Sequence, residues 1–385
     1  MKDLKKDPKN KSMVSGQTLR RRFAHCTLFL AFFTVAPQGH AQNPDQLRNF
    51  DERLTALENK VKEEKIYNSS SRAEVVKGYN LFLTGEFLYL QAEENGLEYA
   101  VKTNDPTFAG QNEKLDYKNI DFDYHIGFRA GIGYNIPHDS WDLSGYWTHY
   151  NTDAKGHSHP HDGDALFPTW SRFNPGPLDT TFALNAKAKL RLNINIIDVE
   201  LGREYTVGKH LNFRPSMGIR TGFFDQHYHV QYFPLILPQG VSIAEDNIKL
   251  KNDYWGVGPK AGIDTQWVLG GGFSIYGSAA ISLIFGEFEI RRNEVFTNFP
   301  PANNKVHHDF HQVRAITDLA LGIGWDLMLA HDQYHFSVRG GYEQHLYFGQ
   351  NQLDRVYYNA AMSNLVSNLG DLSLQGWSAT LRVDF

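Results

Sequence analysis

Residues 122–135 read FDYHIGFRAGIGYN, and this stretch decides the fold class. Every second residue from Phe122 to Tyr134 is apolar, and the residues between them are charged, polar or glycine. Side chains alternate between the two faces of a β-strand, so one face of this strand is apolar along its whole length. Aromatic rings stand at both ends of that face, as in strands that cross a membrane with their rings at the two interfaces.

The same design recurs further along the chain, in residues 254–267 and 313–327. Trp255 and Trp267 belong to the apolar face of one such segment and are twelve residues apart. At about 3.3 Å per residue and a tilt of about 40°, that separation spans roughly 30 Å. This is the thickness of a bilayer's apolar band with its interfaces, so the apolar faces are predicted to meet lipid.

The connections between these segments indicate how the strands are arranged. Five long connections alternate strictly with four short ones, which places the long loops on one side and both termini on the other. Even-stranded outer-membrane barrels have this asymmetry, and a soluble sandwich has no reason to produce it. We predict an all-β protein, a transmembrane antiparallel β-barrel of about ten strands, with a count of twelve left open. The ten predicted strands are 80–91, 121–134, 140–151, 187–203, 212–229, 253–268, 273–290, 312–328, 333–347 and 373–385.

The last strand carries a second signal. Apolar residues alternate from Trp377 to Val383, and the chain stops on the aromatic Phe385. Bacterial outer-membrane barrels commonly end in such a strand. Phe385 is therefore predicted to be a membrane-assembly signal, with the barrel-insertion machinery and outer-membrane lipid as partners.

The N-terminal region is predicted to be separate from the barrel. Residues 1–41 read as a signal peptide, with a basic start, an apolar run that includes Cys26, and small residues before the cleavage point. Residues 42–71 read as a periplasmic helix and linker, and residues 72–385 as the barrel. The apolar residues of the helix have heptad spacing: Leu47, Phe50, Leu54, Leu57 and Val61. A coiled coil that forms a homotrimer and a single amphipathic helix both fit this spacing.

Composition excludes several classes of protein. Mean hydropathy is −0.45, and no segment after residue 41 holds the 18 uninterrupted apolar residues that a membrane helix needs. The formal net charge is −5, which does not indicate a nucleic-acid partner. The chain has one Cys, in the predicted signal peptide, so no disulfide framework is expected.

The signal peptide, the heptad helix, the opening strand YNLFLTGEFLYL at residues 79–90 and the Gly-rich strands ending in Phe385 resemble the Legionella-type major outer-membrane protein family. That family is similar to the major outer-membrane porins of chlamydia-like bacteria. The resemblance covers roughly residues 79–385 and implies a pore-forming, oligomeric surface protein in the bacterial outer membrane. Chlamydial porins are rich in cysteine, whereas this chain after residue 41 has none, so a disulfide-crosslinked envelope role is not implied.

If the apolar faces of the strands meet lipid, their polar faces point the other way and line a lumen. The predicted lumen-lining residues are Arg129, Lys189, Arg191, Arg214, Arg220, Lys260, Asp264, Arg314, Asp318, Arg339 and Glu343. A charged, hydrated pore and an internal salt-bridge network that plugs a narrow barrel are both compatible with such a set. Glycines at inward positions, including Gly131, Gly133 and Gly322, favour open space. The predicted function is a porin for passive diffusion of small hydrophilic solutes and ions, with both termini periplasmic and the long loops extracellular.

Two further interpretations compete with the porin. A closed structural anchor or adhesin would have the same strands, and some outer-membrane barrels are hydrolases. The chain has no Gly-x-Ser-x-Gly element, so we expect neither an enzyme nor a cofactor. His157, His159 and His161 cluster in the longest loop and could bind Zn²⁺ or Cu²⁺, but their flexible spacing around Pro160 gives no fixed ligand geometry and favours surface-exposed polar loop sequence.

Overall fold

The computed structural model describes residues 53–58, 75, 78–104, 114–137, 140–161, 164–172, 181–208, 210–237, 240–297, 303–359, 362–367 and 370–385. Residues 53–58 are helical and lie within the predicted helix, with Leu54 and Leu57 exposed. The predicted signal peptide and the rest of the 42–71 segment lie outside the described residues. In the described part of the chain, no helix is long and apolar enough to span a bilayer.

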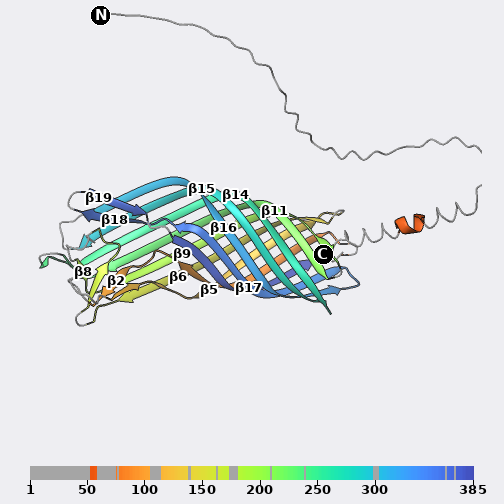
Figure 1. Cartoon of the computed structure of the whole chain (residues 1–385), viewed down its shortest axis with the longest axis horizontal. Coiled ribbons are helices and arrows are strands. Elements are labelled where there is room, and N and C mark those ends of the chain that lie inside the picture. Colours follow the sequence, from red (N-terminus) through yellow and green to blue (C-terminus); the bar gives the residue numbers. More distant parts are fainter. Residues whose placement is uncertain are drawn as a thin grey trace, which may run out of the picture. The chain divides into compact units, whose positions relative to one another are not determined.

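Ten long strands form a closed antiparallel ring, seen from the side in Figure 1. Each strand pairs with its neighbour in the chain order of the long strands, and β20 closes the ring on β1. The ten strands are β1 (Leu81–Glu94), β5 (Tyr124–Asn135), β6 (Trp141–Ser158), β9 (Ala186–Arg203), β11 (Leu211–Tyr232), β14 (Glu245–Gly270), β15 (Phe273–Thr297), β16 (Asn303–Leu329), β17 (Tyr334–Asn351) and β20 (Gly370–Asp384). The prediction of a ten-stranded antiparallel barrel is confirmed.

The structure describes ten further strands, all of them short. They are β2 (Ala100–Thr103), β3 (Leu115–Lys118), β4 (Asp121–Phe122), β7 (Ala165–Pro168), β8 (Phe182–Ala183), β10 (Tyr205–Val207), β12 (Leu235–Ile236), β13 (Ser242–Ile243), β18 (Asp354–Asn359) and β19 (Met362–Ser367). Six of them form a second sheet in the order β13-β12-β8-β7-β2-β3, which we call the cap sheet. All its strands come from the long connections.

The turns at the other end are tight, and local chemistry explains them. Between β14 and β15 the chain reverses at Gly270, Gly271 and Gly272, with φ angles of 112°, 62° and 85°. Residues with a side chain rarely adopt positive φ angles, so three successive glycines favour the reversal at this point. The backbone at Leu81 and Phe385 exchanges two hydrogen bonds of 3.1 and 2.9 Å, which seals the ring at the same end.

The strand register fixes the tilt of the barrel. A path of paired residues that leaves β15 at Phe273 returns to β15 at Phe285, twelve residues further on. A stagger of this size over ten strands corresponds to a strand tilt of about 40°. The path passes through Trp325, Val338, Leu381, Gly85, Ala130, Trp147, Ile197, Thr221 and Val257.

An apolar belt surrounds the half of the ring next to the short turns. Large apolar side chains on every strand point outward and are exposed, among them Trp255 at 50% and Trp267 at 59%. Aromatic pairs on neighbouring strands reinforce it, such as Phe128 with Trp147 and Tyr342 with Trp377, both edge to face. Exposed apolar surface of this extent needs lipid to cover it, which agrees with the predicted lipid-facing strands.

Beyond the belt, the apolar face of the strands changes sides. On β9, Val199 and Ile197 are about half exposed on the outside, whereas Ile194, Leu192 and Leu190 are buried inside. On β11, Phe223 faces outward and the next apolar residues, Phe224 and Tyr228, are buried inside. The break in alternation at Ile196 and Ile197 is therefore no slip in strand register, since β9 stays paired with β11 without a shift.

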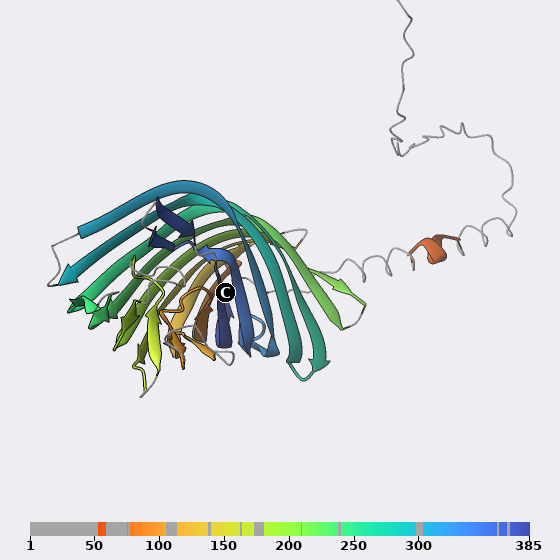
Figure 2. The same cartoon turned by 60° about the vertical axis from the view of Figure 1, so that its left-hand side comes forward.

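In the half of the barrel away from the short turns, side chains fill the interior and the cap sheet covers it. The strands in this half do not form a closed ring. β16 pairs with β17 only from Ile316 to Leu329, while its pairing with β15 continues to Asn303. Within the described residues, the segment 303–315 of β16 is thus a free edge, which runs on beside β15 in Figure 2. The concave side is packed by residues of the cap sheet, including Ala100, Leu166 and Leu235, all buried.

Candidate functional site

The interior of the belt region contains a cavity of about 270 Å³, which we call the chamber. Its lining runs from Glu204 and Gln266, near the short turns, to Leu90 and Leu374, where the apolar interior begins. Eight of the eleven predicted lumen residues line it: Arg129, Arg214, Arg220, Lys260, Asp264, Asp318, Arg339 and Glu343. The inward polar faces of strands β5, β11, β14, β16 and β17 supply them, as the alternation implied.

Three predicted lumen residues lie elsewhere. Lys189 and Arg191 are on the outer surface, because they belong to the part of β9 where the inward positions are apolar. Their prediction assumed one polar face along the whole strand, and that face changes sides at Ile196. Arg314 points inward but lies beside the apolar packing, with its guanidinium 4.8 Å from the ring centre of Phe288.

Arg129 joins two carboxylates across the ring. Its Nη1 lies 2.7 Å from Glu86 Oε2 on β1, and its Nη2 lies 3.2 Å from Glu343 Oε2 on β17. Its Nε donates to the hydroxyl of Thr148 at 3.0 Å. The planar fork of the guanidinium suits such multiple contacts, and it fixes the side chain in the chamber.

His345 continues the network from Glu343. Its Nε2 lies 3.1 Å from Glu343 Oε2, and its Nδ1 lies 2.8 Å from Asp318 Oδ1. The other oxygen of Asp318 accepts from Arg220 Nη1 at 2.7 Å. Arg220 also holds Asp198 with two bonds, of 2.7 and 2.9 Å. The chain of ion pairs therefore crosses from β17 through β16 to β11 and β9.

Lys260 and Arg214 extend the network toward the short turns. The Lys260 ammonium bridges Asp198 Oδ2 at 2.8 Å and Glu200 Oε1 at 2.5 Å. Arg214 donates to both oxygens of Asp142, at 2.9 and 2.5 Å. Its Nη1 lies 3.8 Å from Glu200 Oε2. One continuous ion-pair network thus lines the chamber from Glu86 to Asp142.

Arg339 differs from the other chamber cations. Among the residues that the structure describes, it forms no ion pair, and its guanidinium lies 5.6 Å from the ring centre of Tyr276. The lining as a whole is close to electrical balance. Its cations are Arg129, Arg214, Arg220, Lys260, Arg339 and Arg382, and its carboxylates are Glu86, Asp198, Glu200, Glu204, Asp264, Asp318 and Glu343.

The sequence interpretation missed several members of this network, namely Glu86, Asp142, Asp198, Glu200 and His345. Glu86 was missed because the first strand has apolar residues on both faces, with Phe82 and Leu88 on the same face as Glu86. The change of faces at Ile196 obscured the inward positions of Asp198 and Glu200. A separate treatment of each half of β9 could have found these two carboxylates.

Inward glycines make room for aromatic rings here. A Cβ atom at Gly133 would lie 2.1 Å from the ring of Phe82, and one at Gly131 would lie 2.4 Å from the ring of Tyr146. These glycines were expected to leave open space. Neighbouring side chains fill that space instead, so the chamber is narrower than the glycine content indicated.

The outer end of the chamber is closed by packed apolar side chains. Leu88, Leu90, Ile194, Tyr347 and Leu374 form its boundary and are at most 3% exposed. A second cluster continues from there to the cap sheet. Within the described residues, the polar chamber therefore ends at an apolar core.

Trp170 lies at the centre of that second cluster and is 0% exposed. Its indole Nε1 donates to the carbonyl oxygen of Glu98 at 2.9 Å, and the Arg355 guanidinium lies 4.6 Å from the centre of its ring. Tyr228 packs against it edge to face. A fully buried aromatic side chain contributes about 2–3 kcal/mol, so the cap is held firmly in this conformation.

The predicted metal-binding histidines lie at the outer end of β6. His157, His159 and His161 are all exposed, with ring centres 6.0 Å apart for the first pair and 5.5 Å for the second. Their metal site remains a prediction.

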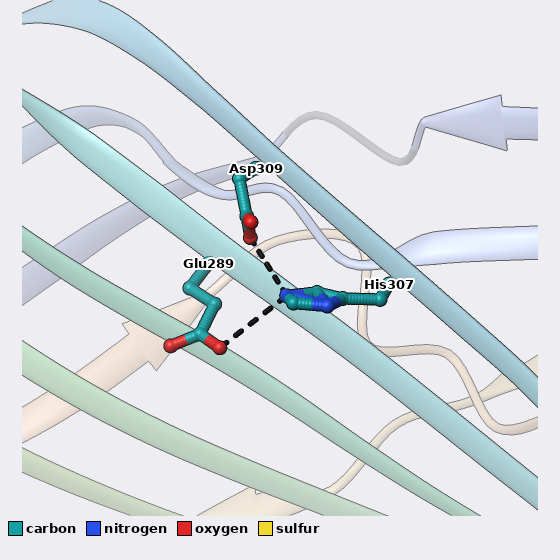
Figure 3. A group of neighbouring side chains, drawn as sticks. All are labelled: Glu289, His307 and Asp309. Atoms are coloured by element: carbon teal, nitrogen blue, oxygen red, sulfur yellow. Dashed lines mark ion pairs between the residues drawn. The ribbon is translucent and has the colours of Figure 1, made fainter.

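A different cluster has closer ligand atoms, and Figure 3 shows it. His307 Nε2 points between two carboxylates, 2.9 Å from Asp309 Oδ1 and 3.3 Å from Glu289 Oε1. Glu289 is also bound by Arg291, whose Nη2 lies 2.5 Å from Oε2. As it stands the cluster is an ion-pair group on the outer surface of β15 and β16.

The chain matches a known protein family over most of its length. Residues 76–385 match the family described as Legionella pneumophila major outer membrane protein precursor. No curated protein shows significant similarity to the sequence.

Solved structures with a similar fold include the outer membrane protease OmpT from Escherichia coli, at 12% identity and a TM-score of 0.41, covering 82% of this chain and 99% of that chain. AlkL, solved in lipid bilayers, has 12% identity and a TM-score of 0.28, covering 68% of this chain and 98% of that chain. A Pseudomonas aeruginosa FadL homologue has 7% identity and a TM-score of 0.22, covering 79% of this chain and 89% of that chain. Likeness at this level does not assign an activity.

Proposed function

The chain belongs to the Legionella pneumophila major outer membrane protein family, and from that premise we propose that it is an outer-membrane porin for small hydrophilic solutes and ions. The chamber is its conducting part, and transport is passive diffusion without a chemical step. The short turns and both ends of the barrel domain face the periplasm, and the cap sheet faces the outside. Oligomer formation through the N-terminal helix remains part of the proposal.

The chemistry of the chamber carries this proposal. Taking charged groups out of water costs several kcal/mol each, and replacing buried ion pairs by apolar residues is often neutral or stabilising. The chain fills its outer interior with apolar side chains such as Leu88 and Ile194. It keeps thirteen charged residues in the chamber, at the depth of the lipid belt. A barrel that served only as an anchor would have no need of them, whereas a path for ions and polar solutes would.

The apolar core implies that this conformation is closed. Conduction then requires the cap sheet and the boundary residues to move aside, as a gate at the outer end. Trp170 and its contacts with Glu98, Tyr228 and Arg355 resist that movement. The expected behaviour is long closed periods interrupted by openings.

The same apolar core supports a second candidate function. A barrel that never opens would be a structural anchor that presents its cap and long strands to the surroundings. Both candidates share the fold and the location, and they differ in whether ions cross the chamber.

Single-channel recording in planar bilayers separates the two candidates. We expect refolded protein to give discrete conductance steps, and Trp170→Ala to raise the open probability because it loosens the cap. Trp255→Ala is the matched control, since it removes an indole from the lipid-facing surface. An absence of steps from correctly folded wild-type protein and from Trp170→Ala would favour the closed anchor.

A further inference from the structure

Six basic side chains form a regular array on the outer surface, just beyond the lipid belt. Strand pairing places Arg191 opposite His227 and His227 opposite Lys251. Two residues further out, the next row contains Lys189, His229 and Lys249 in the same order. We call these two rows on β9, β11 and β14 the basic grid.

All six side chains point away from the interior. The residues between the two rows are Leu190, Tyr228 and Leu250, which are paired with one another and at most 1% exposed. Side chains alternate along a strand, so their neighbours in the grid face outward. Neighbouring strands are about 4.8 Å apart and alternate residues about 6.6 Å apart, so the grid covers roughly 10 by 7 Å.

Acidic side chains flank the grid: Asp153 lies opposite Arg191, and Asp225 and Asp253 lie in the row nearer the lipid belt. Asp153 and Asp253 pair instead with Lys155 and Arg291.

Within the described part of the chain, Lys189, Arg191, Lys249 and Lys251 form no ion pair, although most chamber cations do. Burial and the nearby Lys251 ammonium lower the pKa of His227 from its ordinary value. Like charges on directly opposite positions of neighbouring strands repel one another, so a negative ligand would relieve this repulsion.

The position of the grid identifies that ligand. On β11, His227 lies four residues beyond Phe223, the last lipid-facing ring of the strand, and on β14 Lys251 lies four residues beyond Trp255. Four residues of a strand tilted by about 40° rise roughly 10 Å. Headgroups occupy this layer next to the hydrocarbon, and long basic side chains reach back toward them.

We propose that the basic grid binds the phosphate group of an anionic lipid in the leaflet next to the cap. The grid lies on the same three strands as the lipid belt, separated from it by the one row of Asn193, Asp225 and Asp253, and the charge of the grid is complementary to a phosphate. The proposal depends on a membrane-embedded barrel with the cap outside, but it does not depend on whether the chamber conducts.

The test uses the folded full-length protein in neutral detergent, with phosphatidylglycerol or phosphatidylcholine added at equal chain length. We expect phosphatidylglycerol to be retained in native mass spectrometry and to raise the unfolding temperature, and phosphatidylcholine to do neither. Lys189→Glu with Lys249→Glu should weaken that binding by more than about thirtyfold, because each Lys near an anionic surface contributes roughly fivefold and charge reversal goes beyond its removal. Lys189→Gln with Lys249→Gln is a milder variant in case the charge reversal impairs folding.

The charge-matched control is Lys114→Glu with Lys305→Glu, since both residues are exposed and lie outside the grid. This control should keep the wild-type affinity, and channel recordings of the grid variant should match the wild type. Equal binding by the wild type and both grid variants would overturn the proposal, as would equal loss in the control. Inorganic phosphate that reproduced the phosphatidylglycerol shift would overturn the assignment to lipid.

Discussion

Arg220 and Asp198 form a two-bond ion pair inside the barrel, with Nε 2.7 Å from Oδ1 and Nη2 2.9 Å from Oδ2. The pair joins β11 to β9, and each residue has a further partner in the network, Asp318 for Arg220 and Lys260 for Asp198. Both side chains are under 10% exposed. An ion pair held by two bonds stabilises the barrel and also fixes charges in the chamber. Its effects on stability and on ion selectivity can therefore be tested separately.

Removal of Arg220 should destabilise the barrel. Arg220→Met leaves Asp198 and Asp318 without their guanidinium partner, and breaking a buried pair costs about 3–5 kcal/mol. Urea unfolding in detergent measures this change. Adding Asp198→Asn to Arg220→Met should recover part of the loss, because the network then loses one cation and one anion together and Lys260 keeps Glu200 as a partner. A loss below about 1 kcal/mol for the single variant would contradict the buried-network interpretation.

Reversal of the unpaired chamber cation should change ion selectivity. Arg339→Glu alters the charge of the chamber by two units without breaking an ion pair in the described residues. We expect the reversal potential in a salt gradient to shift toward cation preference. Lys305→Glu makes the same change on the exposed outer part of β16 and should leave the reversal potential nearly unchanged. Equal effects of the two variants would argue against ion flow through the chamber.

Loss of the last residue should impair assembly. Phe385 donates to and accepts from the Leu81 backbone, so its removal takes two hydrogen bonds from the seam between β1 and β20. We expect a chain without Phe385 to give a smaller folded fraction in the outer membrane, measured by heat-modifiable migration on gels. Phe385→Tyr keeps the backbone and the ring and serves as the control. Normal assembly without Phe385 would show that the terminal aromatic is dispensable.

Glu94 should make stability depend on pH. It lies beyond the lipid-facing part of β1 and accepts two bonds from the Gln226 amide, at 2.8 and 3.0 Å. Burial raises the pKa of Glu94 from 4.5 to about 8. The unfolded chain releases this proton near pH 4.5 and the folded chain holds it to about pH 8, so its contribution to stability falls as pH rises between these values.

Glu94→Gln removes this titration and keeps a neutral side chain of similar shape. We expect the variant to be more stable than the wild type at pH 8 and to show a flatter unfolding free energy between pH 5 and pH 8. Glu93→Gln, on the exposed face of the same strand, is the control. Parallel pH profiles for the wild type and Glu94→Gln would contradict the burial of an uncompensated carboxyl group.

The alternation of apolar and polar residues along each strand was enough to predict much of the chamber lining. Arg129, Asp318 and Arg339 line the chamber because each occupies an inward position of a strand that has an unambiguous lipid-facing side. Lys189 and Arg191 were assigned to the lumen by the same rule, which failed because the apolar side of β9 changes within the strand. Alternation reports that two faces differ, but it does not tell which of them faces the core.

The sequence by itself determined the all-β fold, the ten long strands and the closing strand that ends at Phe385. These features are local: alternation is a property of one strand, and turns such as Gly270–Gly272 depend on a few residues. Only the tertiary structure decided which charges meet and where the interior changes from polar to apolar. Arg129 and Glu343 are 214 residues apart in the chain, and they meet because ring closure and a stagger of twelve residues bring β5 and β17 to the same height. Packing of the long connections over the far half then places apolar side chains inside, which no single strand could specify.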